Sequence, residues 1–323
     1  MKEPAIGDIY KARNIVYKYL KPTPLYYNKQ FSDEIGADIY IKFENHQPIG
    51  VFKVRGGLVR ISHLSDEEKS RGVITASTGN HGQSIAYAAR TFGVKAIIYA
   101  PVGNNPDKTR AMKNLGAEVV LTGKDFDEAR KACEKRAVQD KLVFVHPANE
   151  PHLLHGVGTI GLEIFEALPD INMFICPVGG GSSCCSNAIT LKSLNPKIQV
   201  IAVQAEKAPA VYKSYKAKKL LTHPSADTFA DGLATRVAFE YTFNIMQKMI
   251  DDVVLVSEEE MERAIVRLLD TTHNLAEGAG AASTAAAFRY ADRLRGKKVV
   301  LLLSGGNLTR EKLSEILNKW KSV

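Results

Sequence analysis

The sequence lacks the features that would mark a membrane, secreted or repetitive protein. Its apolar runs are short, Val299 to Leu303 among the longest, far below the ~20 residues needed to cross a bilayer. The segment from Met1 to Tyr19 has no apolar core of the kind a signal peptide needs, because charged residues interrupt it throughout. No linker, repeat or low-complexity stretch stands out. We therefore expect a cytoplasmic protein that does not engage a membrane.

Cysteine is scarce and its spacing excludes a disulfide scaffold. The four cysteines are Cys133, Cys176, Cys184 and Cys185, and none forms a CxxC pair. We expect small buried thiols in a reducing compartment. His152 and His155 form a pair without a third ligand, so we interpret them as structural and predict no metal site.

Basic residues outnumber acidic residues in the sequence. Lys and Arg number 43 against 35 Asp and Glu, a net charge of +8, while 45% of residues are hydrophobic and 24% charged. These proportions are those of an ordinary globular protein, and the excess raises the possibility of anionic partners. The densest basic cluster, Lys213 to Lys219, lies beside Tyr212 and Tyr215 but matches no recognition module. We interpret it as a solvated helix face and expect no nucleic-acid partner.

Short β-branched runs alternate with helical patterns along nearly the whole chain, which predicts a doubly wound α/β architecture with a mostly parallel sheet. The expected strands are Ile39 to Phe43, Val73 to Ala76, Ala96 to Ala100, Val119 to Leu121, Val143 to Val145, Met173 to Cys176, Val200 to Val203, Val253 to Val256 and Val299 to Leu303. The expected helices include Gly82 to Thr91, Asp107 to Leu115, Asp125 to Ala137, Gly158 to Ala167, Glu258 to Asp270 and Glu277 to Arg293.

A glycine-rich turn follows the expected strand at Met173. It contains Gly179, Gly180, Gly181, Ser182 and Ser183 and precedes a helix. Backbone N–H groups without neighbouring Cβ atoms can approach an anion closely, and a helix N-terminus adds positive potential. The turn matches neither the Walker pattern nor GxGxxG. It predicts a phosphate cup; the alternative is a tight turn that only needs small residues.

Two further strand-to-helix junctions carry hydroxyl and amide groups. The first contains Ser77, Thr78, Asn80 and His81 and suits a carboxylate or phosphate. Its alternative is helix capping by Ser77 or Asn80, which explains only part of the cluster. The second junction contains Ser304 and by itself predicts only a capped turn.

Lys53 is flanked by apolar residues at the expected start of a helix. A partly desolvated lysine has a lowered pKa and becomes a usable amine nucleophile or base. The alternative is an ordinary surface lysine.

Taken together, these segments resemble the fold-type II pyridoxal phosphate enzymes, in the branch of threonine dehydratase and serine racemase. The resemblance extends from Pro22-Thr23-Pro24-Leu25 to Ser304-Gly305-Gly306-Asn307, with Ala230-Asp231-Gly232 and Glu277-Gly278-Ala279-Gly280 in the same order. It implies two three-layer α/β lobes with mostly parallel sheets. We expect a large cofactor-binding domain of residues 1–71 and 150–323 and a small domain of residues 72–149.

The resemblance also implies a role for each site residue. Lys53 is then bonded covalently to pyridoxal 5'-phosphate, Asn80 bonds the ring hydroxyl, residues 179–183 bind the phosphate, and Ser304 contacts the pyridine nitrogen. Because a serine does not hold that nitrogen protonated, the ring is a milder electron sink, which favours elimination at Cβ. Ser77, Thr78 and His81 are the expected substrate contacts, with Lys53 and Thr78 as the catalytic residues.

The function this implies is β-elimination from L-threonine or L-serine, giving 2-oxobutanoate or pyruvate and ammonia. Serine racemase is an alternative because Thr78 keeps a hydroxyl where racemases of the group use serine. A dehydratase for 3-hydroxyaspartate is another, with Arg130 as a candidate cation, and a non-catalytic anion-binding protein is the most distant. We expect a homodimer or homotetramer, and no feedback control by isoleucine.

Three departures from the family pattern accompany this expectation. Val51 stands where relatives have Ser or Ala, and Ser182 replaces a glycine of the commoner phosphate loop. Gln204 and Ala210 occupy positions where relatives with a divalent-cation site place carboxylates, although Glu206 lies nearby. We therefore predict no metal at that place.

Overall fold

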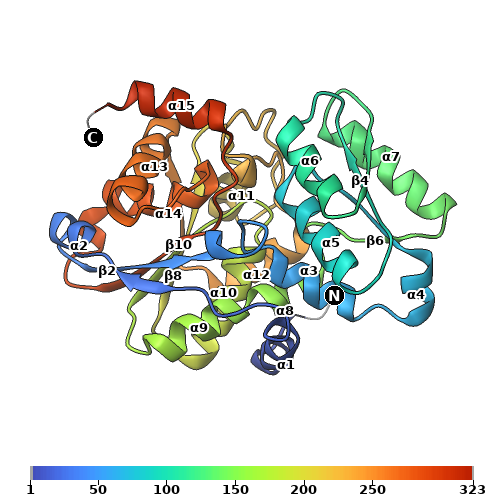
Figure 1. The fold of residues 1–323 in the computed structure, drawn as a ribbon. Coiled ribbons are helices and arrows are strands. Elements are labelled where there is room, and N and C mark those ends of the chain that lie inside the picture. Colours follow the sequence, from blue (N-terminus) through green and yellow to red (C-terminus); the bar gives the residue numbers. More distant parts are fainter. Residues whose placement is uncertain (1–2, 322–323) are drawn as a thin grey trace.

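The computed structural model describes residues 3–321 and contains two separate sheets (Figure 1). The larger sheet has six strands in the order β1 (Leu25–Tyr27), β2 (Asp38–Phe43), β10 (Lys298–Leu303), β7 (Met173–Pro177), β8 (Gln199–Ala205) and β9 (Asp252–Val256). The smaller has four, in the order β5 (Glu118–Leu121), β4 (Ala96–Ala100), β3 (Val73–Ala76) and β6 (Val143–Phe144). Every pairing is parallel except that of β1 with β2.

Helices cover both faces of the larger sheet, so it forms the middle of three layers. Alternate side chains of β7 show this, because Phe174 and Cys176 belong to one apolar cluster while Met173 and Ile175 belong to the other. The surrounding helices are α1 (Ile6–Val16), α2 (Lys29–Ile35), α8 (Pro151–Val157), α9 (Thr159–Ala167), α10 (Ser182–Leu194), α11 (Ala210–Ala217), α12 (Glu240–Met249), α13 (Glu258–Thr272), α14 (Gly278–Arg289) and α15 (Arg310–Lys319).

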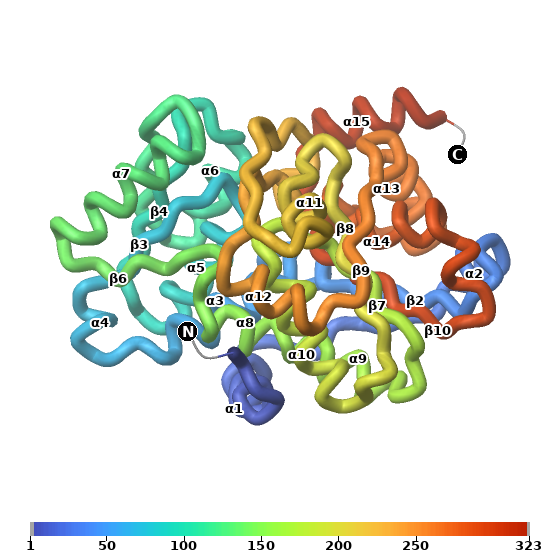
Figure 2. Tube along the Cα trace, turned by 180° about the vertical axis from the view of Figure 1, so that it is seen from behind, coloured from blue at the N-terminus to red at the C-terminus, as the bar shows by residue number. Residues whose placement is uncertain are grey.

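The smaller sheet lies beside the larger one, as Figure 2 shows from behind. Its helices are α4 (Asp66–Arg71), α5 (Asn80–Thr91), α6 (Pro106–Asn114) and α7 (Phe126–Gln139). Helix α3 (Val54–Ser62) packs against both α5 and α8 and so joins the two parts of the molecule. Short 3₁₀ turns lie at η1 (Glu44–His46), η2 (Asp231–Leu233) and η3 (Ala291–Arg293).

The structure confirms the α/β class and the mostly parallel strands. All strands of the smaller sheet fall within residues 72–149, although the two-domain boundary itself stays a prediction. The helix expected from Glu277 to Arg293 is wrong at its C-terminal end. Helix α14 stops at Arg289 because Tyr290 leaves the helical region, with φ −112° and ψ 31°. Within residues 3–321, no helix is both long and apolar enough to span a membrane.

Candidate active site

Lys53 and Ser304 are held next to each other by backbone contacts. Lys53 is the N-cap of α3, and the preceding Phe52 N–H donates to the Ser304 carbonyl at 3.1 Å. Val51 and Gly305 form an isolated antiparallel bridge. The start of α3 is therefore attached to the C-terminal end of β10, which is the end of a parallel sheet where ligands bind.

The Lys53 amine lies in a partly buried position, 5.1 Å from the centre of the Phe52 ring. Desolvation lowers the pKa of Lys53, and the negative charge of Glu277 opposes this effect. A lowered pKa increases the fraction of neutral amine, the form that acts as nucleophile or base. The environment is the one that sequence reasoning expected for this lysine.

A fully buried ionic cluster fixes the first turn of α3. Arg55 donates to Glu44 from Nε at 2.8 Å and to Glu163 from Nη1 at 2.5 Å, and Lys42 donates to Glu163 at 2.5 Å. The two cations balance the two carboxylates, which is the condition for burying such charges. The helix that carries Lys53 is thereby attached to α9.

The glycine-rich turn forms a concave backbone surface at the start of α10. A Cβ at Gly179 would lie 2.1 Å from the Gly232 carbonyl oxygen, and Gly181 has φ +91°, so both positions require glycine. The Ser183 hydroxyl is buried and has no hydrogen-bond partner among the described residues. An unpaired buried hydroxyl at a helix N-terminus fits an anionic oxygen as its missing partner.

The turn between β3 and α5 is organised by Ser77. Its Oγ accepts from the N–H groups of Gly79 at 3.1 Å and Gly82 at 2.9 Å, so the capping interpretation holds for this residue. Thr78 is partly exposed. The His81 ring is buried against Thr75 Oγ1 at 3.1 Å, and desolvation lowers its pKa to about 3. Substrate contacts by these residues stay predictions.

Asn80 connects the smaller sheet to the end of β10. Its Nδ2 donates to Glu277 Oε1 at 2.7 Å, and its Oδ1 accepts from Asn307 Nδ2 at 2.8 Å. Asn307 also donates to the Ile49 carbonyl at 3.1 Å. These bonds fix which way the Asn80 amide faces, and its contact with the cofactor stays a prediction.

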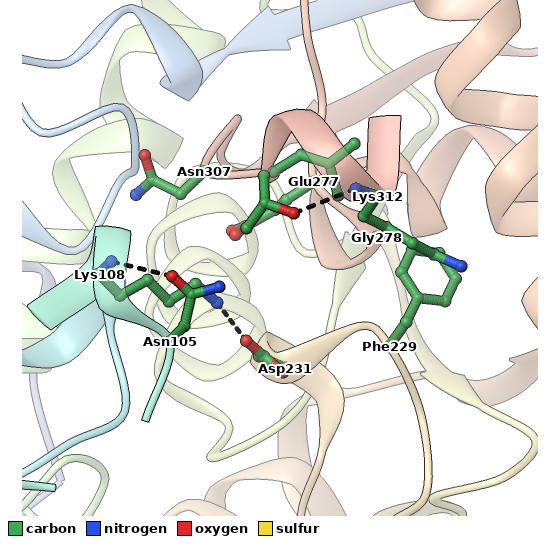
Figure 3. A pocket seen from close by; sticks show the side chains of 10 residues that line it. Asn105, Lys108, Phe229, Asp231, Glu277, Gly278, Asn307 and Lys312 are labelled. Atoms are coloured by element: carbon green, nitrogen blue, oxygen red, sulfur yellow. Dashed lines mark hydrogen bonds and ion pairs between the residues drawn. The ribbon is translucent and has the colours of Figure 1, made fainter. Parts of the chain in front are cut away.

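Sequence reasoning assigned no role to Glu277, Asn307, Lys108 or Asp231, yet all four line one cavity of about 190 Å³. Figure 3 shows their side chains around a common space, with Lys108 and Asp231 joined as an ion pair. Burial raises the pKa of Glu277. The available signal was the position of Glu277 directly before a helix of small residues, and of Asp231 directly before a glycine.

The other residues considered as a substrate-binding cation or as metal ligands have partners of their own elsewhere in the structure. Arg130 forms an ion pair with Glu134 at 2.6 Å along α7, and Glu206 pairs with Arg289 at 2.5 Å. Gln204 Oε1 accepts from the Tyr212 N–H at 2.9 Å. No group of three potential metal ligands is found in the described part of the chain. The four cysteines are free and buried, as predicted.

The site thus combines three features near neighbouring strand ends of the larger sheet. They are a desolvated lysine amine beside β10, a backbone cup with an unpaired hydroxyl after β7, and a cavity lined by polar side chains beside Glu277. These suit a cofactor that has both an aldehyde and a phosphate ester, since the amine can bond the first and the cup can bind the second. The class defined is that of the pyridoxal phosphate enzymes.

Comparison with known proteins agrees with this class. The family model described as "Pyridoxal-phosphate dependent enzyme" matches residues 16–305. The chain belongs to this family, which confirms the cofactor expected from the sequence. It is 41% identical over 314 residues to an L-threonine ammonia-lyase of Thermotoga maritima, covering 97% of this chain and 78% of that protein. It is 39% identical over 317 residues to a catabolic L-threonine dehydratase of Staphylococcus aureus strain N315, covering 97% and 92%.

Solved structures show the same fold. The processed form of threonine deaminase isoform 2 from Solanum lycopersicum superposes with a TM-score of 0.93 at 35% identity, covering 97% of this chain and 86% of that one. Maize serine racemase also gives a TM-score of 0.93, at 28% identity, with 98% of each chain covered. The fold-type II architecture inferred from the sequence is thereby confirmed.

Proposed function

We propose that this protein is a threonine/serine ammonia-lyase that converts L-threonine to 2-oxobutanoate and ammonia, and L-serine to pyruvate and ammonia. The observation that carries the proposal is the position of the Lys53 amine, desolvated and held beside Ser304 at the end of β10. The relatives named for threonine breakdown support the same substrate.

In this proposal, Lys53 holds the cofactor covalently, residues 179–183 bind its phosphate, Asn80 bonds its ring hydroxyl, and Ser304 faces its pyridine nitrogen. When bound, pyridoxal phosphate supplies an electron sink for charge that develops at Cα. The Ser183 hydroxyl gains an acceptor in the phosphate. The first N–H groups of α10, beginning at Ser182, add donors at the positive end of the helix.

The substrate is oriented by the turn of residues 77–80. Its carboxylate accepts hydrogen bonds from Thr78 and from N–H groups at the start of α5 other than those of Gly79 and Gly82, which Ser77 occupies. The substrate amino group would take the place of Lys53 on the cofactor, which frees the Lys53 amine. Held close to the substrate Cα, this neutral amine would remove the Cα proton as a general base. The hydroxide that leaves Cβ needs a proton, and the Lys53 ammonium formed in the preceding step can return it.

The lining of the cavity favours an amino acid with an uncharged side chain. Lys108 is paired with Asp231, and Lys312 with Glu262 at 3.1 Å and Glu315 at 2.7 Å. Arg130 is paired with Glu134. The candidate cations for a second substrate carboxylate are therefore each neutralised, which supports threonine and serine over 3-hydroxyaspartate.

The experiment is a panel of β-hydroxy amino acids assayed for 2-oxo acid, ammonia and D-enantiomer. We expect threonine and serine to give 2-oxo acids. Faster formation of D-serine than of pyruvate would replace the lyase with the racemase, the second candidate. The Thr78 hydroxyl and the likeness to maize serine racemase support that candidate.

We further propose a homodimer or homotetramer in the cytoplasm. Light scattering of the purified protein measures the oligomeric state. Fractionation of cells that express the chain tests the cytoplasmic location.

A further inference from the structure

The cavity beside Glu277 lies between elements from the two sheets. Lys108 comes from α6 beside the smaller sheet, whereas Asp231 comes from η2 and Asn307 follows β10 of the larger one. In Figure 3 the Lys108 and Asp231 side chains approach each other from opposite sides of this space. The cavity thus contains an ion pair that crosses between the two parts of the molecule.

The stem of Lys108 lies directly over the turn that we assign to the substrate carboxylate. A Cβ built at Gly79 would lie 2.8 Å from Lys108 Cδ. The side chain of Lys108 is only 12% exposed, while that of Asp231 is 52% exposed. An ammonium group that is largely removed from water binds an anion strongly unless a carboxylate already neutralises its charge.

Asp231 is fixed in place by close backbone packing on both sides of η2. A Cβ at Gly179 would lie only 2.1 Å from the Gly232 carbonyl oxygen, and a Cβ at Gly232 would lie 2.8 Å from Ala279 Cβ. The segment is therefore held between the glycine-rich turn and α14. Asp231 therefore presents its carboxylate to Lys108 from a closely packed stretch of backbone.

We propose that Asp231 is a specificity-determining residue, because its ion pair with Lys108 prevents that lysine from accepting a second carboxylate on the substrate. The proposal rests on the proposed function, since it concerns which amino acids enter the same site. Without Asp231 the Lys108 ammonium loses its ion-pair partner and has only the more distant charge of Glu277 near it in the cavity. A substrate that carries its own side-chain carboxylate then supplies the missing partner.

The test compares 3-hydroxyaspartate with threonine in the complete enzyme. Asp231→Asn should raise the ratio of kcat/KM for 3-hydroxyaspartate to kcat/KM for threonine by about tenfold, and Asp231→Asn combined with Lys108→Met should return it to the wild-type value. Asp107→Asn is the matched control, because it removes a carboxylate next to Lys108 that pairs instead with Arg110. An unchanged ratio in Asp231→Asn, or the same rise without Lys108, overturns the proposal.

A binding measurement separates this inference from the proposed function. Succinate and butyrate serve as non-reacting dicarboxylate and monocarboxylate probes, with binding followed by the cofactor absorbance. Asp231→Asn should bind succinate about tenfold more tightly than the wild type and leave butyrate unchanged. If the wild type forms no 2-oxobutanoate from threonine, the proposed function fails, while the succinate comparison still decides the role of Asp231.

Discussion

The Asn80 amide donates to the Glu277 carboxylate at 2.7 Å and joins helix α5 to the start of helix α14. Glu277 also acts on Lys53, whose pKa it raises against the larger effect of desolvation. One buried carboxylate therefore influences both the residue assigned to the cofactor ring hydroxyl and the residue assigned to covalent attachment.

Replacing Glu277 with Gln separates these two effects. The Gln amide oxygen still accepts from Asn80, but the negative charge near Lys53 is lost, so the pKa of Lys53 falls further. Neutral amine then persists to lower pH in the substrate complex, and the acidic limb of the kcat profile should move to lower pH. The exposed Glu166→Gln serves as control. A shift to higher pH would contradict the assigned interaction.

Replacing Lys53 with Ala should remove covalent attachment of the cofactor. We expect loss of the visible absorption band and a fall in turnover of about 10²- to 10⁴-fold from lost proton transfer alone. Borohydride reduction followed by mass spectrometry measures the attachment directly. Lys113→Ala, at an exposed position in α6, is the matched control; retained turnover by the Lys53 variant would refute its assignment.

Gly181→Ala should weaken cofactor binding selectively, because Gly181 belongs to the glycine-rich turn assigned to the cofactor phosphate. Alanine at φ +91° costs about 1–2 kcal/mol, and its Cβ would also lie 2.7 Å from Thr242 Cβ. We expect pyridoxal phosphate to dissociate about tenfold more readily, measured by equilibrium dialysis. Gly116→Ala has a matching φ of +92° with no atom within 4 Å. It should lose similar stability but keep normal cofactor affinity; equal losses of affinity in both variants would argue against the assigned phosphate cup.

Buried His81 predicts that the cofactor-free protein loses stability on acidification. Its folded pKa of about 3 lies below the ordinary value of 6.5, so only the unfolded chain takes up a proton between these values. The stabilisation is complete above pH 6.5 and declines as the pH falls toward 3. Between pH 7 and 5, the free energy of unfolding should fall by about 2 kcal/mol less in His81→Gln than in the wild type.

Urea unfolding at both pH values measures this difference. His223→Gln, at a partly exposed position, should behave as the wild type does. Identical pH dependence in His81→Gln and the wild type would show that His81 is not held neutral by burial.

Local sequence patterns predicted the fold well because they reflect local physics. Buried parallel strands such as β7 and β10 have unbroken apolar sequences, which predicted them as strands. The glycine and hydroxyl residues that follow these strands predicted the turns. Strand β1 was not predicted, since it has three residues and exposes Tyr26 and Tyr27 at the edge of the sheet. A short, exposed edge strand leaves little hydrophobic signal.

The site was predicted less completely because its ion pairs join distant parts of the chain. The pairing of Lys108 with Asp231 and the contact of Asn80 with Glu277 have no local pattern. The cofactor roles of Lys53, Asn80 and Ser304 came from the family resemblance. The anion-binding character of the turns and the desolvated amine of Lys53 were inferred from the residues themselves. Structure was needed to show that Ser77 caps its own turn and that Arg130 is paired with Glu134.

The backbone contact between Phe52 and Ser304 keeps most of the proposed cofactor contacts on one part of the molecule. Lys53, Ser304 and the glycine-rich turn are all carried by elements attached to the larger sheet, whereas Asn80 and residues 77–79 follow a strand of the smaller one. A movement of the smaller part away from the larger one would carry with it the turn proposed to bind the substrate carboxylate. It would leave the proposed cofactor contacts other than Asn80 in place. Product release by such a movement would not require release of the cofactor.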